Sequence, residues 1–506
     1  MNSMKNLRFN SIVCLSALSA VPVLAQNIKK TPNVIFIVAD DLGYGDLSCY
    51  GEKTINTPNV DKLANSGILF TDAHSTASTS TPSRYSLFTG CYNWRRNDTG
   101  IAPGDAGMII RPEQTTIADM FKNAGYTTGA IGKWHLGLGD KTGTQDWNGE
   151  ITPGPQDIGF DYSYLMAATG DRVPCVWIEN QKVANYDPEH PIYVSYKKNF
   201  PGEPTGKNNP ELLTKLHPSH GHDQAIVHGI SRIGYMKGGG KALWEDENIA
   251  DTIAAKAVQF IERESDKQFF LYVGTNDIHV PRYPHARFRG KSGMGYRGDA
   301  ILQFDWTVSQ IVDALKRNGI YENTLIVLTS DNGPVVDDGY KDQAKELLGN
   351  HRPWSIYRGT KYSIYEAGTR VPFIVSWPEK IKPGTSKALM SHIDLFASMA
   401  SLVKEKVPAG AAGDSEDQLS ALLGKDKKGR KYVIESSGLL AVTTGDWKYI
   451  MPRQKKAKNT SNNNDKQLGQ LYHLKNDISE KENVVETYPE KANDLRAIIE
   501  KEISKK

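Results

Sequence analysis

Four short apolar runs, each ending abruptly in polar residues, constrain the fold of this chain more than any other feature. Two of them are "NVIFIVADD", with an unbroken apolar core at 34–39, and "TLIVLTSDNG", with one at 325–328. The other two are "FFLYVGTNDIH", which is apolar over 269–273, and the weaker "TTGAIGKWHLG". Unbroken rather than alternating apolar strands are typical of a sheet buried on both faces, and such sheets are mostly parallel.

Helical patterns lie between these strands, such as "TTIADMFKNAGY" and "NIADTIAAKAVQFIERE". The sequence therefore predicts an α/β fold, with a large mixed but mostly parallel sheet sandwiched by helices. After about Val407 the pattern changes to short strands with turns, as in "LAVTTGDWKYIM", and then to a terminal helical pattern. We predict a large domain at 27–405 and a smaller α+β domain of antiparallel sheet plus helix at 406–506.

The N-terminus has the pattern of a secretory signal peptide. It has a short basic start, an apolar run from about Ile12 to Leu24 and small residues up to Ala25. We predict that residues 1–25 are removed on export and that the mature protein is periplasmic or secreted. No later stretch is apolar for long enough to cross a bilayer, so we expect no stable membrane insertion.

Charge and cysteine content exclude several classes of protein. The formal net charge of +3 includes Lys5 and Arg8 of the predicted leader, and 3 − 2 leaves +1 for the mature chain. Nothing in this charge suggests a nucleic acid as a partner. Removal of the leader leaves Cys49, Cys91 and Cys175, an odd number, so the chain is no disulfide scaffold. One bridge with one free thiol and three free thiols both fit the sequence.

Two pairs of oxygen-bearing side chains follow predicted strands. Asp40 and Asp41 follow the first run, and Asp331 and Asn332 follow another. In open α/β sheets ligands bind at the carboxyl ends of the strands, and carboxylate and amide oxygens suit Ca²⁺ or Mg²⁺ but not zinc. Either pair alone could be an ordinary turn after a strand. Two such pairs favour a shared cation site.

The stretch "STSTPSRYSLFTG" joins a polar run to a helical pattern. Thr81 can cap a helix, and Pro82 suits the first helical position. Ser80 would then lie just before the positive end of that helix, where anions bind readily, with Arg84 in its first turn. An ordinary capped helix is the alternative interpretation of these residues alone.

Five motifs, in order along the chain, resemble those of a known family. Residues 80–84, Ser-Thr-Pro-Ser-Arg, with the trailing "LFTG" resemble the sulfatase signature Cys/Ser-x-Pro-x-Arg. "GKWHLG" looks like the family's second signature, and "SDNG" and "RGTKYSIYEAGTRVPFIV" are similar to later motifs. Together they span 33 to about 375. The chain therefore resembles a serine-type, formylglycine-dependent type I sulfatase, which implies an alkaline-phosphatase-like fold with the catalytic domain at 27–405.

The resemblance implies a specific chemistry at Ser80. In that family the matching residue is oxidised to formylglycine (3-oxoalanine), an aldehyde that hydrates to a geminal diol. One diol oxygen would attack the sulfur and expel the alcohol. Deprotonation of the second hydroxyl would then re-form the aldehyde and eject sulfate. This route replaces a plain serine hydroxyl, which is a weak nucleophile.

The resemblance also assigns roles residue by residue. Arg84 would support the formylglycine, while Lys133 and Lys361 would bind sulfate oxygens. His135 would deprotonate the diol, and His279 would bind sulfate or protonate the leaving oxygen. Taken singly, each lysine could be a solvated surface charge and each histidine a satisfied loop residue. One cation, Ca²⁺ or alternatively Mg²⁺, would be held by Asp40, Asp41, Ser80, Asp331 and Asn332.

Two departures from the common pattern are visible. Serine stands at position 80 where many members have cysteine, which implies a serine-type maturase that works without oxygen, hence a bacterial and anaerobic setting. The triplet at 366–368, Glu-Ala-Gly, replaces the commoner Glu-Gly-Gly.

Candidate substrate-binding residues lie in three loops. Asp171 and Arg172 could grip sugar hydroxyls or form a local ion pair. "HPSHGHD" supplies His220, within a histidine cluster that could also be a second metal site, and His351 with Arg352 precedes Lys361. These loops resemble bacterial sulfatases that act on sulfated galactose or N-acetylgalactosamine in host glycans such as mucin or glycosaminoglycan, and we expect the 6-O-sulfate.

Two other functions compete with this interpretation. One is a phosphatase or phosphodiesterase of the same superfamily with unmodified Ser80 as nucleophile, which would normally need two metals and more ligands than the chain offers. The other is a non-catalytic glycan-binding relative. Retention of all six candidate catalytic residues argues against it. These are Ser80, Arg84, Lys133, His135, His279 and Lys361.

Overall fold

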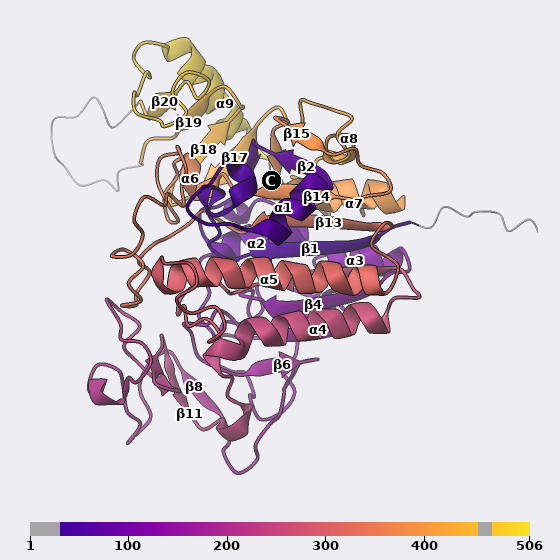
Figure 1. The fold of residues 1–506 in the computed structure, drawn as a ribbon. Helices are drawn as coiled ribbons and strands as arrows, with labels where there is room; N and C mark the ends of the chain where they lie inside the picture. The colour runs from indigo at the N-terminus through magenta and orange to yellow at the C-terminus, as the bar shows by residue number, and fades with distance from the viewer. Residues whose placement is uncertain (1–30, 454–467, 506) are drawn as a thin grey trace, which may run out of the picture. The chain divides into compact units, whose positions relative to one another are not determined.

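The computed structural model describes residues 31–453 and 468–505, so the predicted signal peptide lies outside the described residues. Its main feature is a ten-stranded sheet whose central strands are parallel (Figure 1). All four predicted strands lie next to one another in the centre of this sheet, in the order β13-β1-β12-β4. The sheet order is β15 (Gly384–Ser386), β2 (Gly67–Phe70), β14 (Phe373–Ser376), β13 (Thr324–Ser330), β1 (Asn33–Ala39), β12 (Phe269–Gly274), β4 (Thr127–Lys133), β5 (Tyr162–Met166), β6 (Trp177–Glu179) and β7 (Lys182–Val183).

The reason for this placement is burial on both faces. Every residue of 34–39 is fully buried, as an unbroken apolar run requires. In this sheet antiparallel pairing is found towards the edges, where β14 pairs with β13 and β2, and β6 pairs with β5 and β7. The predicted mixed, mostly parallel sheet is confirmed.

Helices cover the sheet in two groups. One group is α1 (Pro58–Asn65), α4 (Ile249–Arg263) and α5 (Gly295–Arg317), of which α4 and α5 lie side by side across the sheet in Figure 1. The other is α2 (Ser80–Thr89), α3 (Ile117–Asn123) and α7 (Leu395–Val403), which pack against one another. The shorter helices are α6 (Glu366–Thr369) and α8 (Leu419–Leu422). The apolar strands are thereby enclosed between helices.

A smaller antiparallel sheet follows the large one along the chain. It consists of β17 (Val433–Ser436), β18 (Leu440–Thr443), β19 (Lys448–Ile450) and β20 (Gln470–Tyr472), against which α9 (Pro489–Ser504) packs. This agrees with the predicted sheet plus terminal helix, and the boundary at 405 stays a prediction. The part of the chain that the structure describes also has three two-stranded ribbons: β3 (Ala73–His74) with β16 (Met390–Ser391), β8 (Tyr193–Ser195) with β11 (Tyr235–Lys237), and β9 (Ile226–Val227) with β10 (Ile230–Ser231).

Two open questions from the sequence concern the cysteines and the membrane. The structure has Cys49, Cys91 and Cys175 as free thiols, the second of the two alternatives. Over 31–453 and 468–505, none of the helices has both the length and the apolar character that a bilayer crossing requires.

A buried ionic cluster joins the small sheet to the rest of the fold. The Lys448 ammonium lies 3.0 Å from Glu366 and 2.8 Å from Glu435, and His74 Nδ1 lies 2.7 Å from Glu435. All four side chains are fully buried. Burial opposes the charged imidazole, but the charges of Glu435 and Glu366 outweigh it and raise the pKa of His74 to about 9. Arg370 also binds Glu366 at 2.6 Å, and Asp72 binds Arg370 and His74 at 2.8 and 2.9 Å, so three cations face three carboxylates.

Removing one cation from this cluster should destabilise the fold. We expect Lys448→Met to lower the free energy of unfolding by about 3–5 kcal/mol, because the buried carboxylates of Glu366 and Glu435 each lose one cationic partner and the cluster loses one positive charge. Chemical denaturation measures the change, with the exposed Lys431→Met as control. An unchanged midpoint for Lys448→Met would contradict a stabilising role for the cluster.

Candidate active site

The carboxyl ends of the central strands bring the predicted polar residues together. Asp40 and Asp41 follow β1, and Asp331 and Asn332 follow β13. The two strands are parallel, with Ala39 opposite Ser330, so these two pairs of polar residues lie next to each other at the end of the sheet. Lys133 ends the next strand but one, β4, and His279 follows β12. The sheet therefore produces the convergence that the sequence predicted.

Ser80 is the first residue of α2 and is buried. The predicted helix start was wrong by two residues, since Thr79 is the N-cap and the Ser83 amide closes the first turn on its carbonyl. The Thr81 hydroxyl, which we expected to cap the helix, instead donates to the carbonyl of His135 at 3.0 Å. The Thr81 hydroxyl is therefore engaged in a tertiary contact and does not cap the helix. Ser80 lies directly at the positive end of the helix.

The Ser80 hydroxyl is held by charged groups. It donates to Asp331 Oδ2 at 2.6 Å and accepts from Lys133 Nζ, also at 2.6 Å. Arg84 binds the same oxygen of Asp331, with Nη2 at 2.7 Å and Nε at 3.0 Å. Burial opposes ionisation of this carboxyl, but Arg84 and Lys133 outweigh it and keep the pKa of Asp331 well below its usual range. Tyr272, which the sequence analysis missed, contacts Arg84 through its hydroxyl.

Two buried lysines border the site from different sides. Lys133 Nζ contacts Asp40, while Lys361 Nζ lies 2.8 Å from Asp41 and 2.8 Å from Asp338. Burial lowers the pKa of Lys133. The pKa of Lys361 is raised well above its usual value, because the charges of Asp41 and Asp338 outweigh the effect of burial. Nothing in the sequence distinguished Asp338 from its neighbour Asp337.

The two predicted catalytic histidines each have one ring nitrogen engaged by a backbone carbonyl. His135 Nε2 lies 2.9 Å from Ala102 O, and His279 Nδ1 lies 2.7 Å from Val280 O. A carbonyl only accepts, so each of these nitrogens carries a proton. His135 Nδ1 is buried and has no hydrogen-bond partner among the described residues. Burial and the nearby Lys133 charge lower the pKa of His135 well below its usual value, so its ring is neutral.

These residues surround a pocket of about 50 Å³. Its lining is Thr79, Ser80, Ile101, His135, Asp171, Arg172, His222, Ile233, His279, Asp338, Lys361 and Tyr362. Ser80, His135, His279 and Lys361 line it directly, and Lys133 and Arg84 support it through Ser80 and Asp331.

At one side of the pocket three charged side chains are linked to each other. Arg172 Nη1 lies 2.8 Å from Asp171, and His222 Nε2 lies 2.9 Å from the other oxygen of Asp171. His222 Nδ1 also faces the carbonyl of His220, so both ring nitrogens meet acceptors. Burial opposes the charged ring, but the hydrogen bond and charge of Asp171 outweigh it and raise the pKa of His222. The ion pair that we considered as an alternative therefore forms, and it faces the pocket.

Three predicted substrate-binding residues do not reach the pocket. His220 is exposed, whereas His222, whose backbone φ is 51°, lies at the pocket with its ring bonded to Asp171. His351 is buried elsewhere, with Nε2 2.7 Å from Asp46, and Arg352 is exposed. The positions of His220, His351 and Arg352 do not support their predicted role. Neither of the metal-capable clusters found in the described chain includes the three histidines of "HPSHGHD".

The predicted metal ligands fit a hard divalent cation. They offer oxygen donors, and Asp40 and Asp41 lie close enough to His279 for their ligand atoms to share one ion. Asn332 donates through Nδ2 to Asp41 at 2.7 Å, while its Oδ1 is buried and accepts no hydrogen bond from any described residue. A buried amide oxygen without a donor, beside carboxylates, is a position that a cation would satisfy.

Comparisons with known proteins agree with this geometry. The Sulfatase family model matches residues 32–405. The N-acetylgalactosamine-6-O-sulfatase of Bacteroides thetaiotaomicron is 53% identical over 481 residues, covering 94% of this chain and 93% of that protein. Human arylsulfatase A is 30% identical over 439 residues, covering 83% and 75%. A solved structure from work on glycosaminoglycan metabolism by B. thetaiotaomicron superposes with a TM-score of 0.89 and 51% identity, covering 94% of this chain and all of that one.

Proposed function

Because the chain belongs to the sulfatase family and hydrolyses sulfate esters of carbohydrates, we propose that it removes the 6-O-sulfate of galactose or N-acetylgalactosamine. Host glycans such as mucin or glycosaminoglycan would supply these sugars. The observation that carries the proposal is one pocket in which Ser80, at the start of α2 and bonded to Lys133, is lined up with Lys361 and an Asp171–Arg172–His222 group. The 53% identical relative named for the 6-O-sulfate of N-acetylgalactosamine supports the choice of ester.

The family uses formylglycine and a divalent metal, and we assign both to named residues of this chain. Ser80 would be converted to formylglycine by a serine-type maturase and would supply the nucleophile. Asp40, Asp41, Ser80, Asp331 and Asn332 would hold Ca²⁺, or alternatively Mg²⁺. When bound, the cation would stabilise negative charge at the reacting oxygens.

The chain's own residues bind and orient the sulfate group. Its three anionic oxygens would face the N-terminus of α2, where backbone amides and the helix dipole favour negative charge. Lys361 lines the pocket and would contact these oxygens there. Lys133, which binds the Ser80 hydroxyl, would contact them next to Ser80. Because the lysines are held by Asp40 and Asp41, they need little reorganisation to meet the substrate.

The two histidines are arranged to move protons on different sides of the pocket. Nδ1 of His135 has a lone pair and no competing donor in the described part of the chain, so it can accept a proton. His279 Nε2 is the free nitrogen of that ring and lies 3.9 Å from Asp41. When Nε2 is protonated, it would donate from that position to a sulfate oxygen or to the leaving oxygen.

The function is tested by the choice of substrate. Protein co-produced with a serine-type maturase should release sulfate from galactose 6-sulfate or N-acetylgalactosamine 6-sulfate in preference to the 4-sulfates. Comparison of aryl sulfate with aryl phosphate separates the proposal from a phosphatase with unmodified Ser80. Binding of the glycan without turnover would favour the non-catalytic alternative. Export is part of the proposal, supported by the signal-peptide pattern at 1–25, and cell fractionation tests it.

The Asp171 group should determine sugar recognition. We expect His222→Gln to lower kcat/KM on the 6-sulfated sugar about 10- to 100-fold, because Asp171 loses the charged partner that orients it towards the sugar hydroxyls. Activity on a small aryl sulfate, which has no such hydroxyls, should stay within about twofold. His220→Gln is the matched control, two residues away and exposed. Equal loss on both substrates would contradict the assignment.

A further inference from the structure

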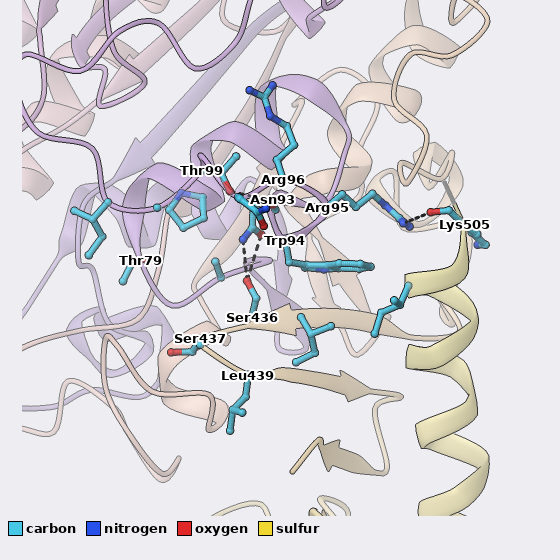
Figure 2. A pocket seen from close by; sticks show the side chains of 18 residues that line it. Thr79, Asn93, Trp94, Arg95, Arg96, Thr99, Ser436, Ser437, Leu439 and Lys505 are labelled. Atoms are coloured by element: carbon cyan, nitrogen blue, oxygen red, sulfur yellow. Dashed lines mark hydrogen bonds between the residues drawn. The ribbon is translucent and has the colours of Figure 1, made fainter. Parts of the chain in front are cut away.

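A second and larger cavity, about 800 Å³, lies beside the catalytic pocket, and Figure 2 shows the side chains that line this second cavity. We call it the side groove; it is formed by the segment Asn93–Ile101, the turn Ser437–Leu439 and Ile503 of α9. We infer that the side groove binds uncharged sugar residues of the glycan to which the sulfated residue belongs. This inference rests on the proposed function, because it extends the substrate from one sugar to a chain.

The side groove and the catalytic pocket have a common wall. Thr79 and Ile101 line both cavities. Ser437 of the side groove donates to the carbonyl of Tyr362 at 2.7 Å, and Tyr362 lines the catalytic pocket. Ser78 closes the wall, since its hydroxyl meets Ser437 at 2.6 Å and its carbonyl accepts from the Tyr362 amide at 3.1 Å. A chain that leaves the catalytic pocket over Ile101 therefore enters the side groove.

The sizes of the two cavities also favour a sulfated sugar end in the catalytic pocket and further sugar residues in the side groove. The catalytic pocket, at about 50 Å³, has room for a few water-sized groups, which suits a sulfate and the atoms next to it. Sites that enclose a whole small molecule usually measure roughly 300–1,000 Å³. The side groove, at about 800 Å³, lies in that range. The remainder of an oligosaccharide has to lie outside the catalytic pocket, and the side groove is the adjoining space.

Arg95 borders the side groove but is fully engaged inside the protein. Its Nε and Nη2 bind Asp414 at 2.8 and 2.6 Å, and Nη2 also meets Glu502 at 3.2 Å. Its Nη1 donates to the carbonyls of Glu502 and Lys505 at 2.8 and 2.9 Å. A guanidinium has five N–H donors, so these bonds leave none for an incoming anion. Arg95 anchors the end of α9 and is no receptor for a second sulfate.

The other two cations among the described residues that line the side groove are also paired. Arg96 binds Asp98 and in Figure 2 points away from Trp94, and the Lys505 ammonium lies 2.6 Å from Glu502. A highly sulfated chain would need cations that are free to meet it. The pairing of each cation with a carboxylate therefore favours uncharged sugars in this groove.

The surface that is left suits sugar rings. Ile101 and Ile503 are 45% and 49% exposed, unusually open for large apolar side chains, and Asn97 is exposed beside them. Half-buried Trp94 adds an aromatic ring. Sugars have apolar C–H faces and hydroxyl edges, so apolar contacts interspersed with neutral hydrogen-bonding groups match them.

The test uses a double variant that leaves the catalytic pocket intact. Asn97→Ala with Ile503→Ala changes only side-groove residues, and both are exposed, so the fold should persist. We expect the wild type to prefer a neutral tetrasaccharide ending in the 6-sulfated sugar over that sugar alone by about tenfold in kcat/KM. In the double variant this ratio should fall to about one, with the single sugar unaffected. Asn208→Ala with Leu212→Ala, exposed elsewhere, is the matched control.

A binding experiment separates failure of this inference from failure of the proposed function. The sulfate-free tetrasaccharide is titrated into each protein and followed by ligand-observed NMR. Binding that weakens in the Asn97/Ile503 variant and not in the control supports the side groove even if no 6-sulfate is hydrolysed. Equal binding in both variants, or a wild type without preference for the longer substrate, overturns the inference. Tighter binding of a polysulfated tetrasaccharide than of the neutral one overturns its restriction to uncharged sugars.

Discussion

Ser80→Ala is expected to reduce sulfate release by about four orders of magnitude or more, to the background of the assay. The hydroxyl at the start of α2 is the group from which the nucleophile is made, and no described neighbour can replace it. The fold should persist, because Asp331 keeps its bonds to Arg84 and Lys133 keeps its contact with Asp40. Sulfate release and thermal unfolding, measured on the same preparation, separate loss of chemistry from loss of structure.

Mass spectrometry shows whether Ser80 itself is changed. The tryptic peptide Leu63–Arg84, from protein made in an anaerobic host with a serine-type maturase, should lack two hydrogens at Ser80. Ser66→Ala is the matched control, since Ser66 lies in the same peptide and should leave the modification in place. An unmodified Ser80 in protein that cleaves aryl phosphate would move the chain to the phosphatase alternative.

Those parts of the fold were predictable whose burial can be inferred from the local pattern of apolar residues. Residues 34–39 had to lie in a sheet covered on both sides, because an unbroken apolar run places apolar side chains on both faces of a strand. The order of the strands and the antiparallel β14 could not be derived in this way, since they depend on long-range pairing. The start of α2 was missed because Thr81 bonds to the distant His135 carbonyl instead of capping its own helix.

The same distinction separates the site residues that were predicted from those that were missed. Asp40 and Asp331 could be found because each directly follows a recognisable strand, and the parallel sheet determines where the ends of such strands meet. Asp338 and His222 lie in loops without periodicity, and their contacts with Lys361 and Asp171 depend on the path of the chain. Closeness in sequence to Lys361 was a poor guide for His351, which turns instead to Asp46.

Removal of the bound metal is expected to lower activity about a thousandfold and to lower the thermal midpoint. The loss of rate reflects several kcal/mol of charge stabilisation at the reacting oxygens. The loss of stability follows because a ligand that binds only the folded state stabilises it. Chelation by EDTA, followed by gel filtration, calorimetry and sulfate release, measures both effects, and Ca²⁺ or Mg²⁺ is then added back.

The two added cations should not be equivalent. Asp40, Asp41 and Asp331 can offer several carboxylate oxygens, each group binding through one oxygen or two, which suits Ca²⁺, whereas Mg²⁺ demands a near-octahedral arrangement and keeps its waters. We therefore expect Ca²⁺ to restore more of the midpoint. Asn332→Ala removes the amide oxygen that accepts no hydrogen bond in the described chain and should reduce the shift that Ca²⁺ produces, without affecting Lys133 or Arg84. Full activity and an unchanged thermal midpoint after chelation would mean that Lys133 and Lys361 alone balance the charge of these carboxylates. That result would contradict the proposed metal site.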